Sequence, residues 1–220
     1  MDTDTLIQQL SAEAQPAPPL RPPWQRTLAW LGLSVLYVVA VALIIGPRPG
    51  LLQEFTSTRF TVEQAATLAT AVLAAFAAFC AVIPGWPKWI LALPLVPLAV
   101  WLGALGAGCV LELTRSGGHI VVRAHWTCVP AIILISAVPA TAMAIMLRRG
   151  APMYPHAAIA LGGLAAAALG NLGLWTYHAP DVGFMVVLWH MGTVAVIAAL
   201  AGWLGPRIHH WKTVASPGQA

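Results

Sequence analysis

Cysteines and histidines are the residues of this 220-residue chain that could carry out redox or metal chemistry. The three cysteines (Cys80, Cys109 and Cys128) are too few for a disulfide scaffold, and they form no C-x-x-C, haem-attachment or zinc-ribbon spacing. Cys109 and Cys128 are predicted to lie near one membrane surface, where a disulfide requires their Cα atoms within about 6–7 Å. Three interpretations remain open: a reversible sensing pair, a structural bridge, or two inert thiols.

The seven histidines raise a second possibility, a site for a soft metal ion. His119, His125 and His178 are predicted on the same side as Cys109 and Cys128, so His178 joins the two cysteines as a candidate sensing residue. No two histidines face each other at one depth on paired helices, as a b-type haem requires. We therefore expect no metal and no cofactor, with the histidines hydrogen-bonded or interfacial.

Sequence patterns typical of enzymes are missing. The chain has no G-x-G-x-x-G, no phosphate loop and no Ser-His-Asp set. None of the seven acidic residues falls within a predicted span, although transporters of this size are expected to carry membrane-embedded carboxylates. We predict a protein that is not an enzyme, with a small transporter or a redox or haem-binding membrane protein as the alternative.

The apolar stretches determine the predicted fold. Hydrophobic residues make up 59% of the chain and charged residues 8%, whereas a soluble domain carries about 25% charged residues. Membrane lipid must therefore solvate most of the surface. Each apolar run reaches the ~20 residues that cross a bilayer. We predict an all-α integral membrane protein, a bundle of six transmembrane helices at about 27–46, 64–83, 89–111, 124–147, 156–177 and 182–205.

Prolines and small residues should shape these helices. The prolines of the third and fourth spans (Pro94, Pro97, Pro130 and Pro139) are expected to kink the helices or to mark their ends. The fifth span carries a stripe of small residues against which another helix can pack closely: Gly162, Ala166 and Gly170. That stripe packs within the bundle or, as the alternative, forms a homodimer face.

The charges and tryptophans indicate an orientation. With six spans both termini share one side, which then holds seven Lys and Arg residues against four on the other. The positive-inside rule therefore predicts a bacterial inner-membrane protein with both termini in the cytoplasm. Tryptophans near predicted membrane interfaces fit aromatic belts: Trp24, Trp30, Trp86, Trp89, Trp126, Trp175, Trp203 and Trp211.

The domains predicted are a polar tail (1–26), the transmembrane domain (27–205) and a short cytoplasmic tail (206–220). In the first tail, Leu6, Ile7 and Leu10 fall on one face of a short helix, and a Pro-rich spacer follows. A free helix of this length is marginal in water, so its apolar face is expected to order against a partner protein. A frayed tail, or one lying on lipid headgroups, is the alternative.

Several segments together carry a family resemblance. They are residues 4–10 (DTLIQQL), 18–23 (PPLRPP), 147–155 (LRRGAPMYP) and 178–184 (HAPDVGF), with Trp189 before Gly192. In this order, across six spans, the chain resembles the NrsF-type membrane anti-sigma factors. The resemblance covers nearly the whole chain.

The resemblance implies regulation of transcription. Family members hold an extracytoplasmic-function sigma factor at the inner membrane, with no direct contact to nucleic acid, and release it on a stress signal. Carried onto this chain, Asp4, Leu6, Ile7 and Leu10 would form the sigma-binding segment. The family often has a cysteine after the histidine between the last two spans, whereas here Ala179 follows His178. Sensing through Cys128 and a cysteine at position 179 is therefore not available to this protein.

Overall fold

The computed structural model describes residues 2–13, 20–115, 117, 128–151 and 153–176, and in the last stretch 192, 195, 196, 198–200 and 203. Within this part the chain is helical and contains no β-strand. The elements are α1 (Thr3–Glu13), α2 (Pro23–Ile45), α3 (Leu51–Glu54), α4 (Thr58–Cys80), the 3-10 helix η1 (Lys88–Ala92), α5 (Leu95–Arg115), α6 (Cys128–Leu147) and α7 (Pro155–Leu174).

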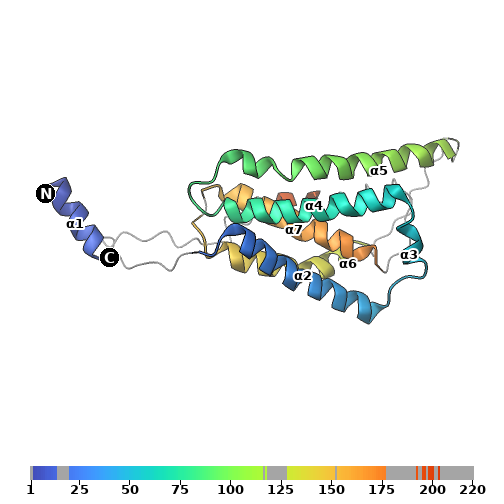
Figure 1. The fold of residues 1–220 in the computed structure, drawn as a ribbon, viewed down its shortest axis with the longest axis horizontal. Coiled ribbons are helices and arrows are strands. Elements are labelled where there is room, and N and C mark those ends of the chain that lie inside the picture. Colours follow the sequence, from blue (N-terminus) through green and yellow to red (C-terminus); the bar gives the residue numbers. More distant parts are fainter. Residues whose placement is uncertain are drawn as a thin grey trace.

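Helix α4 lies at the centre of an antiparallel bundle, packed between α5 and α7, with α2 beside it and α6 against α2 and α7 (Figure 1). Its buried face is rich in alanine: Ala71, Ala74, Ala75 and Ala78 are all inaccessible to solvent. Side chains this small let helix backbones approach one another closely. The core is therefore built by close helix packing, with a few large side chains such as Phe79, Trp30 and Trp101 filling the remaining space.

Among the residues that the structure describes, five helical stretches are long and apolar enough to cross a membrane. They are Pro23–Ile45, Thr58–Cys80, Lys88–Arg115, Pro130–Leu147 and Pro155–Leu174. The outer faces of the bundle are apolar as well: Leu36, Leu43 and Ile44 on α2 are 69, 73 and 84% exposed. A contiguous apolar surface of this kind is compatible with a membrane protein. The sixth predicted span, 182–205, lies mostly outside the described residues.

The prolines define helix ends as expected in the third span. The chain forms a 3-10 turn that ends at Ala92, and α5 begins at Leu95, directly after Pro94. Pro94 has no N–H to donate, but its carbonyl accepts the N–H of Leu98 at 3.0 Å. Helix α2 begins at Pro23, four residues before the predicted start, because a proline at the first helical position loses no intrahelical hydrogen bond.

Two predictions from the sequence are wrong. The second span is predicted to begin at residue 64, which leaves Glu63 outside it, but α4 starts at Thr58, and Glu63 lies inside the helix with only 4% exposure. Trp30 was assigned to an interfacial belt, yet it is fully buried, and its indole Nε1 donates to the Pro139 carbonyl at 2.9 Å. In both cases a polar group near a predicted boundary is buried within the bundle.

The small residues of α7 pack within the bundle. A Cβ on Gly162 would stand 2.8 Å from Cγ of Met143, and one on Gly170 would overlap the Ser136 hydroxyl. Both neighbours belong to α6, so these glycines make the close α6–α7 contact possible. Ala166 is buried beside them.

Candidate partner-binding site

Helix α1 is the one sizeable polar element of the described chain that stands apart from the bundle (Figure 1). It begins after Asp2, whose carbonyl accepts the Leu6 N–H at 3.1 Å, and the Asp4 carboxylate lies in its first turn. A negative charge there favours the helix dipole. Leu6, Ile7 and Leu10 share one face and are 40, 55 and 58% exposed. The apolar face of α1 therefore faces solvent.

One end of the bundle lies where α2 begins. We call it the near end, and it comprises residues 20–26, 81–88 and 147–155. Arg26, on α2, contacts both α6 and α4 there. Its side chain is buried, its Nη2 donates to the Met146 carbonyl, and its guanidinium carbon lies 4.5 Å from the centre of the Phe79 ring. The last carbonyls of a helix lack intrahelical partners and carry partial negative charge, so a buried cation stabilises the end of α6.

The segment after α6 is held against the end of α4. The Ala151 N–H donates to the Val82 carbonyl at 3.1 Å, and the Met153 N–H donates to the Ala81 carbonyl at 3.2 Å. Gly150 makes this approach possible, because a Cβ there would come within 2.8 Å of the Val82 carbonyl oxygen. The Arg-Arg-Gly-Ala stretch (148–151) thus joins the α6–α7 connection to the end of α4.

The near end is strongly cationic. Its exposed cations are Arg21, Lys88, Arg148 and Arg149, in addition to the buried Arg26. The aspartates and glutamates in the described part of the chain lie elsewhere, in α1 or toward the opposite end of the bundle. An asymmetry of this sign is what the positive-inside rule associates with the cytoplasmic face.

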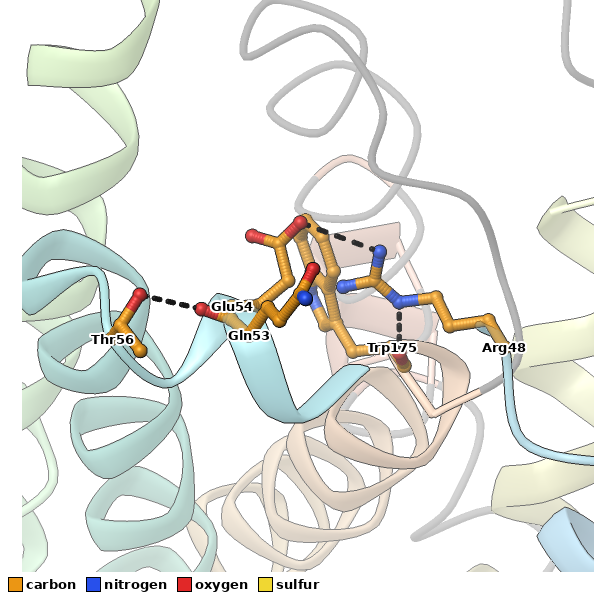
Figure 2. A network of polar contacts seen from close by, with 5 residues as sticks. All are labelled: Arg48, Gln53, Glu54, Thr56 and Trp175. Carbon is orange, nitrogen blue, oxygen red and sulfur yellow. Dashed lines mark hydrogen bonds and ion pairs between the residues drawn. The ribbon is translucent and has the colours of Figure 1, made fainter. Parts of the chain in front are cut away.

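The opposite or far end comprises residues 46–61, 108–115 and 174–176, and Arg48 stabilises it. Figure 2 shows the Arg48 side chain crossing from the α2–α3 connection to Glu54 and Trp175. Its Nε donates to the Trp175 carbonyl at 3.2 Å, and its Nη1 lies 3.6 Å from Oε1 of Glu54. The backbone N–H of Arg48 donates to the Thr176 carbonyl at 2.9 Å. These contacts tie α3 to the end of α7.

The structure describes only one of the three candidate sensing side chains, that of Cys109. Cys109 is half-buried on α5, and the preceding Gly108 lies against the Arg59 guanidinium, with 2.7 Å between a Cβ at Gly108 and Nη1. Cys128 is the first residue of α6, but its side chain lies outside the described residues, as does His178. Whether Cys109 and Cys128 meet stays a prediction.

Metal binding has no support in the described ranges, where no three His, Cys, Asp or Glu side chains come together. His119, His125 and His178 belong to the undescribed stretches, so the hypothesis of a metal site including them stays untested.

Sequence reasoning missed a set of buried polar groups toward the far end. Three atoms with no hydrogen-bond partner in the described part of the chain are Oε1 of Glu63, Nε1 of Trp101 and Oδ1 of Asn171. The side-chain nitrogen of Asn171 has no hydrogen-bond partner there either. The sequence offered one signal for Glu63, which directly precedes a long apolar run. A carboxylate at such a position marks either the start of a helix or a place just inside it, and the first interpretation was chosen.

The described residues form a bundle of apolar helices with one cationic end and a separate amphipathic helix, and an exposed apolar helix face of this kind is typical of proteins that bind another protein. The family model for NrsF, negative regulator of sigma F, matches residues 10–211. The chain belongs to the NrsF family, as the resemblance predicted, and this membership implies a sigma factor as its partner.

The match begins at Leu10, so Asp4, Leu6 and Ile7 precede it. No curated protein and no solved structure matches the chain.

Proposed function

We propose that this chain is a membrane anti-sigma factor that holds an extracytoplasmic-function sigma factor at the inner membrane and releases it on a stress signal. The observation that carries the proposal is the free apolar face of α1 (Leu6, Ile7 and Leu10), presented by a bundle whose family regulates sigma factors. An apolar helix face of this kind binds in a groove of a partner protein. A sigma factor so occupied cannot use the same surface to bind RNA polymerase.

The tether strengthens the interaction. Confining α1 to the membrane surface raises the effective concentration of its apolar face near any sigma factor that reaches the membrane. The ordering of a short helix costs free energy, which each buried leucine offsets by about 1.5–3 kcal/mol. Asp4 lies outside the apolar face and is proposed to contact the rim of the groove.

The proposal requires the amino terminus to lie in the cytoplasm, because sigma factors are found only there. The cationic near end, from which residues 20–23 lead toward α1, supports a cytoplasmic amino terminus. A fluorescent reporter that folds only in the cytoplasm, fused before Met1, should be active. Alkaline phosphatase inserted after Leu52 on α3, at the far end, should be active in the periplasm. The reverse pattern would contradict the proposed orientation.

Sensing is proposed for the far end, where Cys109 lies beside the Arg59–Gly108 contact. Labelling of Cys109 and Cys128 before and after reduction distinguishes a bridge from two thiols. If both label fully under oxidising conditions, the sensing pair is excluded.

The experiment that tests the function is capture of sigma factors by the full chain in lipid nanodiscs, with identification by mass spectrometry. We expect one sigma factor to be enriched, and RNA polymerase core enzyme to compete with the chain for it. Capture of no sigma factor from a lysate of the bacterium that naturally produces the chain would contradict the proposal.

A further inference from the structure

We propose that the near end of the bundle is a second docking surface for α1, so that the sigma-binding face has a self-bound state. In this state the apolar face of α1 contacts the hollow between η1 and residues 153–154. The inference rests on the proposed function of α1 and adds a regulation to it: the bundle and the sigma factor compete for one helix face.

The near-end hollow can hold one apolar side chain. It has a volume of about 120 Å³ and lies between the end of α4, the start of η1 and residues 153–154. For comparison, an engineered cavity of about 150 Å³ holds a benzene molecule. Its apolar walls include Ile83, Ile90 and Leu91, and Trp86 and Met153 at its rim are 41 and 59% exposed. Lys88 and Tyr154 add polar groups to the lining, so the hollow suits a leucine or isoleucine side chain that is accompanied by a polar or acidic neighbour.

The negative charges of the amino-terminal segment make α1 a suitable occupant of the hollow. The first 20 residues contain Asp2, Asp4 and Glu13 and neither lysine nor arginine. The hollow is flanked by cations: Lys88 lines it, with its Nζ 5.7 Å from the centre of the Tyr154 ring, and Arg148 and Arg149 precede residues 153–154 in the α6–α7 connection. Asp4 stands one turn before Ile7, so docking the apolar face brings an acidic group toward these cations. Complementary charge of this kind orients an encounter and suppresses alternative partners.

The chain is long enough for this docking. Nine residues separate Glu13 from Pro23, and an extended segment of that length spans up to about 30 Å. The hollow lies at the end of α4, which packs directly against α2. Because neighbouring helix axes are about 8–10 Å apart, the required distance is on the order of two helix spacings.

The self-bound state also couples the two ends of the bundle. Helix α4 carries Arg59 at the far end, and its last residue, Cys80, lines the hollow together with Ala81, which follows it. A displacement of α4 would therefore change the hollow, and with it the balance between the self-bound and the sigma-bound state of α1.

Cross-linking of the full chain in nanodiscs of zwitterionic lipid tests the inference. In a background with Cys80, Cys109 and Cys128 replaced by alanine, Ile7→Cys is paired with Met153→Cys and treated with a short bis-maleimide. The control pairs Ile7→Cys with Trp24→Cys, a 55% exposed position in the first turn of α2 that an undocked tail reaches as easily as the hollow. Trp86→Cys provides a second rim position if Met153→Cys unfolds.

We expect cross-linking to Met153→Cys or Trp86→Cys to exceed that of the control pair by about tenfold or more, because docking raises the local concentration. Arg148→Glu with Arg149→Glu should lower the yield. Equal yields for rim and control pairs would overturn the inference.

Addition of the sigma factor captured by the chain separates this inference from the proposed function. If the sigma factor binds and lowers the cross-linking yield, both hold. If the sigma factor binds, but no rim cross-link forms when the sigma factor is absent, the self-bound state is overturned and the proposed function stays intact. Rim cross-linking by a chain that binds no sigma factor overturns the proposed function alone.

Discussion

Gly150 and Val82 lie in such close contact that a Cβ on Gly150 would stand 2.6 Å from the Val82 Cβ. Carbon atoms in ordinary contact are about 3.5–4.0 Å apart. This contact allows the backbone of Ala151 to donate to the Val82 carbonyl. The α6–α7 connection and the end of α4 are therefore one packed unit, on which the near-end hollow depends.

Replacement of Gly150 by alanine should destabilise this unit. We expect Gly150→Ala to lower stability by about 1–3 kcal/mol, since the backbone must shift to relieve the overlap. Thermal unfolding in detergent measures the change. Gly32→Ala on α2 is the matched control, because a Cβ there meets nothing within 4 Å, and an alanine in an open helix position should be neutral or stabilising. Equal loss of stability in both variants would contradict the packing described.

Removal of the buried cation at the near end should also weaken the bundle. Arg26→Met keeps much of the apolar packing but leaves the Met146 carbonyl without its donor and removes the contact with the Phe79 ring. We expect a loss of about 1–3 kcal/mol, the cost of an unsatisfied buried carbonyl. Arg21→Gln removes an exposed charge at the same end and should change stability by less than about 0.5 kcal/mol. Thermal unfolding of the two variants side by side gives the comparison.

At the far end the hydrogen bond of Arg48 should matter more than its ion pair. Arg48→Gln removes the bond to the Trp175 carbonyl and should cost about 1.5–3 kcal/mol. Glu54→Gln should cost less than about 1 kcal/mol, because the Glu54 side chain is 35% exposed and the N–O distance is 3.6 Å. The double variant should resemble Arg48→Gln. A larger loss for Glu54→Gln than for Arg48→Gln would show that the ion pair dominates.

The Cys80 thiol should be protected from alkylation. It is 2% exposed at the inner wall of the near-end hollow. In a variant with Cys109 and Cys128 replaced by alanine, we expect N-ethylmaleimide to label Cys80 at least about 100-fold more slowly in the folded protein than in denaturant, since labelling requires local opening. Rapid labelling of the folded chain would mean that the hollow is open to solvent down to its wall.

Much of the fold follows from the apolar runs and the prolines. Stretches of about 20 apolar residues identified the five helices long enough to cross a membrane, and Pro94 indicated the break before α5. Their exact ends did not follow, because charged residues were used as boundaries. Arg26 and Glu63 show why this fails: both ionisable side chains lie inside a helix and are buried, Arg26 against the Met146 carbonyl and the Phe79 ring.

Of the candidate partner-binding site, only the part formed by residues close together in the sequence could be predicted. The spacing of Leu6, Ile7 and Leu10 is contained within one helix, so periodicity was enough to indicate an apolar face. The near-end hollow joins residues 80–91 to residues 153–154, and no local pattern indicates that these segments meet. The need for a glycine at position 150 could not be predicted either. It arises from the close contact with Val82, which lies 68 positions earlier in the chain.

The most direct measurement is the affinity of the captured sigma factor for the full chain in nanodiscs. Leu6→Asp with Leu10→Asp should weaken binding at least about 100-fold, because two buried leucines contribute about 3–6 kcal/mol. Gln8→Asp with Gln9→Asp adds the same charge to the polar side of α1 and should change the affinity by less than about fivefold. Unchanged affinity of the leucine double variant, or equal loss in both, would contradict the claim that the apolar face of α1 binds the sigma factor.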